Sequence, residues 1–335
     1  MKEVRIILNI KISVVIIGKN EEDNILRNIN SIKNTVEYKK SETEILYIDS
    51  GSEDNTIFNI TSNHNDIKVY RIEDDEVKTA SKGRHLGALL CKGEYILFLD
   101  ADMELHNLFI SRILDVSKTD PGFIGGIGIR NDIFLNNGIE VYRKQNVYNT
   151  LSEKKCNHFG GALFIKREFL IGIGNYGSSI VANEEAELDS RIIQKGKFIK
   201  EYPFQMINHY IRIEDDKKSL KNILFGKRNQ GIGQGFRHSF YFKSTFSFIK
   251  RFNLFFIAFF GDLISLTLVL ASVINYSLFF IAILIQISLS IFYMKNRKLK
   301  FFVLHKIYAL HFFKGVLNYK LGNKINFVRI DNYKY

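Results

Sequence analysis

The feature that most restricts the fold of this chain is an apolar run of 43 residues, Phe252–Met294, which contains a single charged side chain, Asp262. A helix that spans a bilayer needs about 20 residues, so the run is long enough for two such helices joined by a tight connection. The polar residues 275–277 lie near its midpoint and suit that connection. We therefore expect two transmembrane or re-entrant helices at about 252–294.

Cations flank both outer ends of this run, at 243–251 and at 295–300, and none lies at its midpoint. This distribution predicts a hairpin whose two ends both face the cytoplasm. Two alternatives stay open: a pair of buried core helices, or an interfacial or re-entrant arrangement, because Asp262 would be costly at mid-bilayer. The next segment, 301–317, mixes aromatic residues with Lys and His, which predicts a basic amphipathic helix at the membrane interface.

Charge and cysteine content restrict the partners and the compartment. The net charge is +12, and residues 241–335 hold thirteen Lys or Arg but only two acids, so the basic excess lies in the most apolar part of the chain. Such a distribution favours a membrane over nucleic acid as the partner. The two cysteines, Cys91 and Cys156, provide no disulfide framework, which fits a reducing cytosolic setting. The N-terminus lacks a secretory signal pattern and is expected to be mature protein.

The first 240 or so residues alternate short apolar runs with amphipathic segments. Apolar runs of this length predict strands, and apolar residues at helical spacing predict helices between them. The strands are expected at 12–17, 45–48, 67–72 and 95–99, and the helices at 25–36 and 79–91. This β-α-β-α-β order predicts an α/β fold with a mostly parallel central sheet. We expect one domain, 1–240, followed by a membrane-associated region, 241–335.

Two acids follow the most apolar of these strands, Asp100 and Asp102, separated by the small Ala101. Ligands of such sheets bind beyond the carboxyl ends of the strands. Carboxylate oxygens suit Mg²⁺ or Mn²⁺, which proteins hold with one or two carboxylates plus substrate phosphates. The alternative is a loop acid pair that includes a helix cap. We favour a metal site, because an apolar strand has no structural need to end in two acids.

Polar residues at neighbouring positions suit a nucleotide. Asp49 ends the second strand and could accept hydrogen bonds from a base or ribose. It could instead cap the next helix, a role also open to Ser50 or Ser52, since Ser50 and Glu53 have the spacing of a capping box. Arg84 lies in the helix that leads to the Asp-Ala-Asp strand. A guanidinium suits a diphosphate, although most helical arginines are simply solvated.

An acidic segment, Glu184–Asp189, packs four acids into six positions. Glu187 and Arg191 have i, i+4 spacing and are expected to form a structural pair. That leaves Glu184 and Glu185 available for a cavity, where neighbouring like charges would raise a carboxyl pKa and favour general-base work. The alternative is a solvated acidic helix start, which the helix dipole stabilises. Spacing alone favours this alternative.

Three further features have two interpretations each. Gly160 and Gly161 precede an apolar strand, where glycines permit close approach of a ligand or simply a bulge. His209 is either a third metal ligand or an ordinary histidine. The basic, glycine-rich segment Gly226–Gly235 is either a flexible flap that closes over a diphosphate or a mobile linker.

Taken in order, these segments resemble family 2 glycosyltransferases of the GT-A fold. The resemblance spans approximately residues 12–235. The order and spacing of the matching pieces make it specific. The matching pieces are SVVIIGKNEE at 13–22, IDSGSEDNT at 48–56, GRHLG at 83–87, GEYILFLDAD at 93–102, FGG at 159–161 and EEAELDSR at 184–191. Two departures concern the nucleotide contacts: Gly18-Lys19 ends the first strand where Pro or Thr with an aromatic is common, and His85 replaces a frequent Asn.

The resemblance implies a nucleotide-sugar donor, a divalent cation (Mn²⁺ or Mg²⁺) and a hexosyl transfer with inversion at the anomeric carbon. The residues that it implies for the donor are Asp49 at the base, Arg84 and Asp100 at the nucleotide and ribose, and Ser50, Gly160 and Gly161 close by. Asp102 is the favoured metal ligand, with Asp100 and His209 as further candidates. The usual catalytic base is the Asp of a Glu-Asp pair, which aligns with Glu185 and leaves Glu184 as its competitor.

The expected acceptor is a hydroxyl of a lipid-linked or cell-surface glycan, as in polysaccharide biosynthesis. The enzyme would lie at the cell membrane with its catalytic domain facing the cytoplasm. A polyprenyl-phosphate sugar synthase is an alternative, but its acceptor phosphate needs no general base, so the acidic segment favours a hydroxyl. A processive synthase is disfavoured, because its Gln-x-x-Arg-Trp motif is missing from a chain without Trp. A non-catalytic, membrane-anchored nucleotide-binding protein is the alternative outside the enzyme class.

Overall fold

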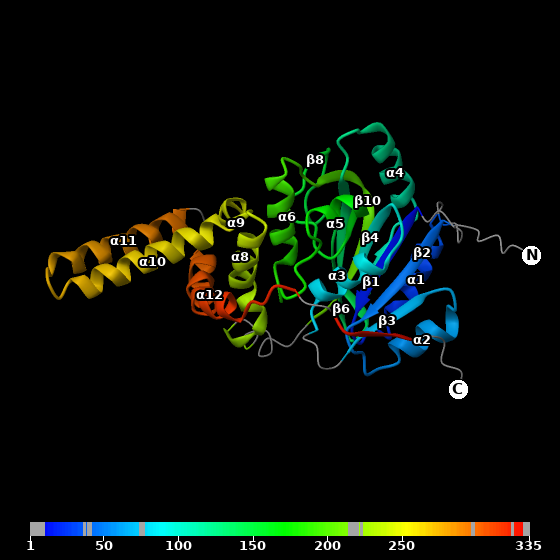
Figure 1. The fold of residues 1–335 in the computed structure, drawn as a ribbon, viewed down its shortest axis with the longest axis horizontal. Helices are drawn as coiled ribbons and strands as arrows, with labels where there is room; N and C mark the ends of the chain where they lie inside the picture. Colours follow the sequence, from blue (N-terminus) through cyan, green and yellow to red (C-terminus); the bar gives the residue numbers. More distant parts are fainter. Residues whose placement is uncertain are drawn as a thin grey trace, which may run out of the picture.

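In the computed structural model, the protein has an α/β body from which a pair of helices projects (Figure 1). The structure describes residues 11–35, 38, 42–73, 78–213, 221, 224–295, 299–322 and 325–330.

Four parallel strands form the first half of the central sheet, in the order β3-β2-β1-β4. They are β1 (Ile12–Gly18), β2 (Thr43–Asp49), β3 (Lys68–Ile72) and β4 (Tyr95–Asp100). All four lie where the apolar runs predicted them. The register pairs Gly18 with Asp49, and Ile17 with Asp100, so the carboxyl ends of β1, β2 and β4 are level.

Helices alternate with these strands because their apolar residues recur on one face. The helix α1 (Ile25–Lys33), for example, buries Ile25, Ile29 and Ile32. The other helices of the body are α2 (Thr56–Asn63), α3 (Ala80–Leu90), α4 (Phe109–Thr119), α5 (Arg167–Gly172) and α6 (Glu184–Gln194). The α/β class with a mostly parallel sheet in its first half is therefore confirmed.

Antiparallel strands continue the sheet beyond β4. β9 pairs with β4 and with β6, and β10 runs parallel to β6 but antiparallel to the short β5. Their bounds are β5 (Met103–Leu105), β6 (Gly125–Asn136), β7 (Ile139–Lys144), β8 (Lys154–Lys155), β9 (Leu163–Lys166) and β10 (Lys200–Arg212). The pairing of β10 with β5 carries His209 alongside Met103, and so brings it next to the Asp-Ala-Asp turn.

The glycine-rich segment is a packed helix and not the flexible flap or linker that its composition suggested. It forms the 3₁₀ turn η1 (Lys227–Gln230) and the start of α8 (Gly231–Tyr241). A Cβ at Gly231 would strike the carbonyl of Ala182, and one at Gly233 would strike that of Phe312. These glycines therefore serve close backbone packing of α8 against the body and against α12 (Leu299–Asn318).

The projecting helices are α10 (Asn253–Ala271) and α11 (Ser277–Lys295), which follow the short helix α9 (Thr245–Arg251). Both are long and apolar enough to cross a membrane. We call this pair the arm; in Figure 1 it is the yellow and orange hairpin that extends away from the sheet. Its outer surface is lined by exposed apolar side chains, among them Phe260, Leu263, Leu266, Val273, Ile274, Phe280 and Leu284. The predicted pair of hydrophobic helices is confirmed.

The single acid of the arm, Asp262, lies in a small polar cluster. It accepts hydrogen bonds from Gln286 on α11, at 3.1 Å, and from the ammonium group of Lys306 on α12. Lys306 also donates to Gln286, at 3.0 Å. A charge in apolar surroundings is tolerated when it is paired in this way.

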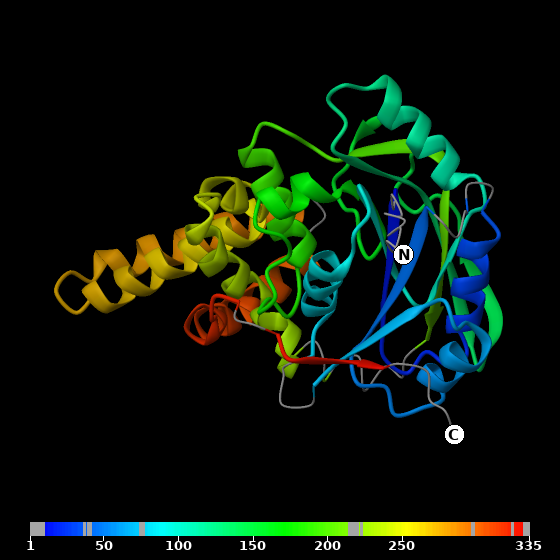
Figure 2. The same ribbon diagram turned by 45° about the vertical axis from the view of Figure 1, so that its right-hand side comes forward.

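The C-terminal segment returns to the body, which the sequence did not indicate. β11 (Phe327–Ile330) pairs antiparallel with β3 at the edge of the sheet, with Phe327 opposite Ile72. Figure 2 shows this red strand passing beneath the helices and joining the edge of the sheet. The chain is thus attached to the body on both sides of the arm.

Candidate active site

The loops after β1 and β2 are joined by hydrogen bonds into one rim at the carboxyl edge of the sheet. Backbone N–H groups of the first loop donate to side chains of the second: Asn20 to Ser52 at 3.0 Å, and Glu21 to Thr56 at 2.8 Å. Asn20 adopts a left-handed conformation (φ 58°), which asparagine tolerates better than most residues. The rim therefore presents preformed backbone beside Asp49.

Asp49 is fully buried and shapes its own loop. Its carboxylate accepts hydrogen bonds from the backbone of Gly51 and Ser52 and from the Ser52 hydroxyl, at 2.5–3.1 Å. The expected capping box of Ser50 and Glu53 does not form, because the next helix begins only at Thr56 and has Asn55 at its cap position. The backbone N–H groups of Gly51 and Ser52 are nearer to Asp49 in the sequence than those of the next helix, and they donate to its carboxylate instead.

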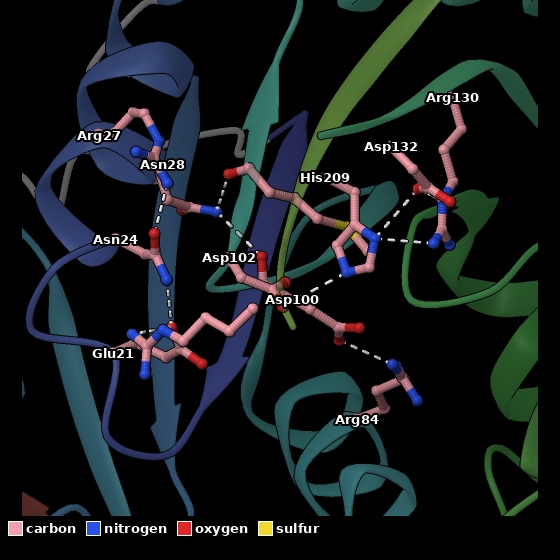
Figure 3. Close-up of polar contacts among 12 residues, drawn as sticks. Glu21, Asn24, Arg27, Asn28, Arg84, Asp100, Asp102, Arg130, Asp132 and His209 are labelled. Carbon is pink, nitrogen blue, oxygen red and sulfur yellow. Dashed lines mark hydrogen bonds and ion pairs between the residues drawn. The ribbon is translucent and has the colours of Figure 1, made fainter. Parts of the chain in front are cut away.

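A buried asparagine fixes the Asp-Ala-Asp turn. The Asn28 amide on α1 donates to the carbonyls of Asp100, at 3.1 Å, and Met103, at 2.7 Å (Figure 3). Ala101 is buried beneath Gly18, where a Cβ on the glycine would lie 2.8 Å from that of the alanine. Sequence reasoning missed Asn28, although a polar residue on the apolar face of a helix is a signal for such a role.

A chain of polar contacts extends from Asp102 across the sheet (Figure 3). His209 Nε2 lies 3.3 Å from Asp102 Oδ2, and its Nδ1 lies 3.2 Å from Asp132 Oδ1 and 2.7 Å from the guanidinium of Arg130. Burial alone would lower the pKa of His209, but the hydrogen bonds to Asp102 and Asp132 outweigh it and raise that pKa. The chain therefore holds the imidazole against Asp102.

The residues around Asp102 fit a divalent cation in part. Asp102 Oδ1 is buried without a hydrogen-bond partner in the described part of the chain, and such an oxygen normally has one. The expected set of Asp100, Asp102 and His209 is not assembled, since Asp100 turns toward Arg84. Within the described ranges, no cluster of three His, Cys, Asp or Glu is placed to hold a metal. Mg²⁺ and Mn²⁺ need only one or two carboxylates when substrate phosphates complete the shell.

Gly161 belongs to the same corner of the site. A Cβ at this position would collide with the carboxylate of Asp100. The neighbouring Gly160 has a positive φ of 51°. The two glycines expected from the sequence therefore let the chain turn tightly against Asp100.

Arg84 is an internal bridge, with a side chain only 2% exposed. Its guanidinium donates to Asp100 Oδ1 at 2.7 Å and to Glu184 Oε1 at 2.6 Å, and it lies 3.5 Å from Glu185 Oε1. The planar guanidinium group thus connects the end of β4 to the start of α6 through charge-assisted hydrogen bonds. The sequence predicted that Arg84 contacts a diphosphate. In the structure its guanidinium instead contacts Asp100, Glu184 and Glu185.

Glu184 and Glu185 face different surroundings. Glu184 is buried in its ion pair with Arg84, whereas the side chain of Glu185 is 24% exposed. Burial and the charge of Glu184 raise the pKa of Glu185 to about 7, although Arg84 opposes this shift. Glu185 therefore changes its protonation state near neutral pH, which suits a general base.

Glu185 borders a cavity of about 750 Å³ between the body and the base of the arm. The acid at the next turn is structural: Glu187 pairs with Arg191 at 2.7 Å, as its spacing predicted, and lies 2.8 Å from His238. The acidic segment is thus divided into a buried structural part and one carboxyl that faces a cavity.

Comparison with known proteins agrees with this fold. Residues 13–173 match the model of the glycosyl transferase family 2. The sheet and its level strand ends have the GT-A arrangement. The matched segment, slightly less than half of the chain, is a glycosyl transferase family 2 domain. A search of the curated proteins gives no significant match.

Solved structures are similar to this chain at low sequence identity. GalNAc-T7, crystallised with UDP, GalNAc and Mn²⁺, has 21% identity and a TM-score of 0.50; the match covers 61% of this chain and 44% of that one. The chain thus spans less than half the length of GalNAc-T7. S. aureus TarS (1–349) in complex with UDP-GlcNAc has 15% identity and a TM-score of 0.48, with 70% and 73% covered.

Proposed function

We propose that the protein is a metal-dependent, inverting glycosyltransferase that moves a sugar from a nucleotide-sugar donor to a hydroxyl of a membrane-associated glycan acceptor. The observation that carries the proposal is the position of Glu185. This carboxyl has a pKa of about 7, lies 3.5 Å from the arginine that holds Asp100, and faces a cavity at the base of the apolar arm.

The donor would bind at the carboxyl edge of β1, β2 and β4. Asp49 and Ser50 would face the nucleotide, and Gly160 and Gly161 leave room beside Asp100. The unpartnered oxygen of Asp102, supported by His209, would hold Mn²⁺ or Mg²⁺. When bound, the cation supplies charge stabilisation of the diphosphate leaving group. The presence of UDP and Mn²⁺ in crystals of GalNAc-T7 supports this assignment.

Glu185 would remove the proton from the acceptor hydroxyl as that oxygen attacks the anomeric carbon from the side opposite the diphosphate. A base should have a pKa near the working pH, because it must be ionised and still accept a proton. Arg84 holds Asp100 and Glu184 in place, so its proposed role is to position the acids rather than to touch substrate.

Transfer to a lipid phosphate is the less favoured function. A phosphate acceptor is already ionised and needs no base. Such an acceptor would give no catalytic role to the Glu185 carboxyl, whose pKa is raised. The arm supports attachment to a membrane, and the cations at both of its ends support a body that faces the cytoplasm.

The experiment is a donor screen with the purified full chain in detergent. Sugar nucleotides are incubated with Mn²⁺, and release of the nucleotide diphosphate is measured with and without membrane lipid extract as the acceptor source. We expect Asp102→Asn to reduce turnover by at least 100-fold, a loss of about 3 kcal/mol or more in transition-state stabilisation. Glu140→Gln, at an exposed acid on β7, serves as the matched control. Full Mn²⁺-dependent turnover by the Asp102 variant would overturn the metal assignment.

A further inference from the structure

The cavity beside Glu185 has two walls of different origin. One wall comes from the body and from η1, and includes Glu185, Gly160 and Arg228. The other comes from the base of the arm and from α12, and includes Arg251, Phe252 and residues 253–255, with His305 and Tyr308. A volume of about 750 Å³ is within the range of small-molecule sites. The membrane-facing part of the chain therefore contributes directly to the space in front of the proposed base.

Two arginines give this cavity its positive charge. Arg228 is exposed at its rim. Arg251 lies 3.3 Å from His158 and 3.7 Å from the buried Asp189, and 18% of its side chain is exposed. Burial and the charge of Arg251 lower the pKa of His158, so this histidine adds no full charge at neutral pH. Two guanidinium groups that line one cavity are suited to phosphoryl oxygens, which accept bidentate hydrogen bonds.

Part of the cavity lining is apolar. Phe252, Leu254 and Phe255 line the cavity at the start of α10. The exposed apolar side chains of the same helix, such as Ile257 and Phe260, continue outward along the arm. A ligand with an anionic head and an apolar chain would match both the arginines and the apolar part of the lining.

Building on the proposed function, we propose that this cavity is the acceptor site and that the acceptor is a saccharide linked to a lipid through a phosphate or diphosphate. Arg228 and Arg251 bind the phosphoryl oxygens, Glu185 faces a hydroxyl of the saccharide, and the lipid chain lies against the first turn of α10. A neutral cell-surface glycan would offer no anionic group to the exposed Arg228, and Arg251 would keep only its contacts with Asp189 and His158. The inference thus chooses between the two acceptor classes that the sequence left open.

The test is a binding assay that needs neither donor nor transfer. The full chain in detergent is titrated with farnesyl diphosphate, with farnesol and with inorganic pyrophosphate, and binding is followed by thermal shift and by isothermal titration. Farnesyl diphosphate is expected to bind at least tenfold more tightly than either of the other two probes. Equal binding of farnesol would overturn recognition of the anion, and equal binding of pyrophosphate would overturn the lipid.

Four variants locate the bound probe. Arg228→Gln is expected to weaken binding of farnesyl diphosphate by about tenfold or more, as the loss of a hydrogen bond to a charged group implies, and Arg228→Lys by less. Arg237→Gln, an exposed arginine on α8 that contacts Tyr241, is the matched control and should bind like the parent chain. Asp102→Asn separates this cavity from the donor site.

If Asp102→Asn weakens binding and Arg228→Gln does not, the probe occupies the donor site and the inference fails. Arg228 is preferred to Arg251 for this test, because removal of Arg251 would leave Asp189 buried without its cation. Failure of the proposed function is recognised separately: no sugar nucleotide would then be turned over, whatever the binding assay shows.

Discussion

Glu185 differs from its neighbours in the acidic segment by what surrounds its carboxyl group. Glu184 and Glu187 each pair with a buried arginine, whereas Glu185 has only a 3.5 Å contact with Arg84 and an open side toward the cavity. Incomplete pairing combined with burial disfavours the charged form, and this keeps the pKa of the carboxyl near 7.

This environment predicts the pH dependence of transfer. Because the base must be deprotonated, kcat/KM should be low below about pH 6, rise through pH 7 and level off above it. Glu185→Gln should lose at least 100-fold and the pH dependence with it, whereas Glu185→Asp should retain part of the activity. A pH-rate profile of the parent chain and both variants checks this. An unchanged profile in Glu185→Gln would assign the base to another group.

At the level of single residues, the chemical role of a side chain was easier to predict from the sequence than the residues that it contacts. Acids placed after an apolar strand, as at Asp102, stand out in the sequence because nothing in the strand requires them. The division between Glu184 and Glu185 could not be foreseen, because it depends on Arg84, which is 100 residues away in sequence. Asn28 was missed for the same reason, since both of its acceptors lie on a different segment.

Among the elements, α8 and α12 are joined by close backbone contact as well as by side-chain packing such as that of Phe236 on Phe312. A Cβ on Gly233 would meet the carbonyl of Phe312, and one on Gly315 that of Gln230. Helices approach this closely only where small residues face each other. The attachment of the arm to the body therefore depends on glycines that composition alone presented as a flexible loop.

Gly233→Ala should accordingly destabilise the protein by about 1–3 kcal/mol, the usual cost of forcing extra volume into a packed site. Gly172→Ala is the matched control: it also lies in a helix, but its Cβ would meet nothing within 4 Å. Thermal unfolding of the detergent-solubilised chains compares the two. Equal melting temperatures would show that α8 and α12 can separate without cost.

A second prediction at this scale concerns the polar cluster of Asp262, Gln286 and Lys306. Lys306→Met should destabilise the arm by about 1–3 kcal/mol, less than for a fully buried pair, because it leaves Asp262 unpaired in apolar surroundings. Adding Asp262→Leu should restore most of that loss. Melting temperatures of the single and double variants test this, and additive losses would contradict pairing as the reason for the two charges.

The order of elements was predictable in the first half of the sheet and not in the second. Strands β1 to β4 are short, apolar and separated by helices, so local pattern is sufficient to locate them. The long strands β6 and β10 mix polar and apolar residues, and their pairing with β5 and β9 joins distant segments. β11 is short and mostly exposed, and its place is decided by the free edge of β3 rather than by its own sequence.

For the whole molecule, the length and apolar character of the arm predict that it crosses the bilayer. A spanning hairpin would place Asn275, in the turn between α10 and α11, on the side opposite the body. Asn275→Cys should then react with a membrane-impermeant maleimide added to intact cells. Cys91 and Cys156 are buried, with pKa values raised to about 11 and 12, so they give little background. Labelling only after cell lysis would indicate a re-entrant or interfacial arm.

The return of β11 to the edge of β3 affects how such a chain is made. β11 follows its partner strand β3 by more than 250 residues of chain, from Ile72 to Phe327. The helices of the arm, α10 and α11, lie between the two strands in sequence and are therefore made before β11. The edge strand β3, whose Arg71 lies 3.7 Å from Asp49, acquires its partner only after the arm has been synthesised. A chain stalled or truncated at the arm would expose that edge to aggregation and proteolysis.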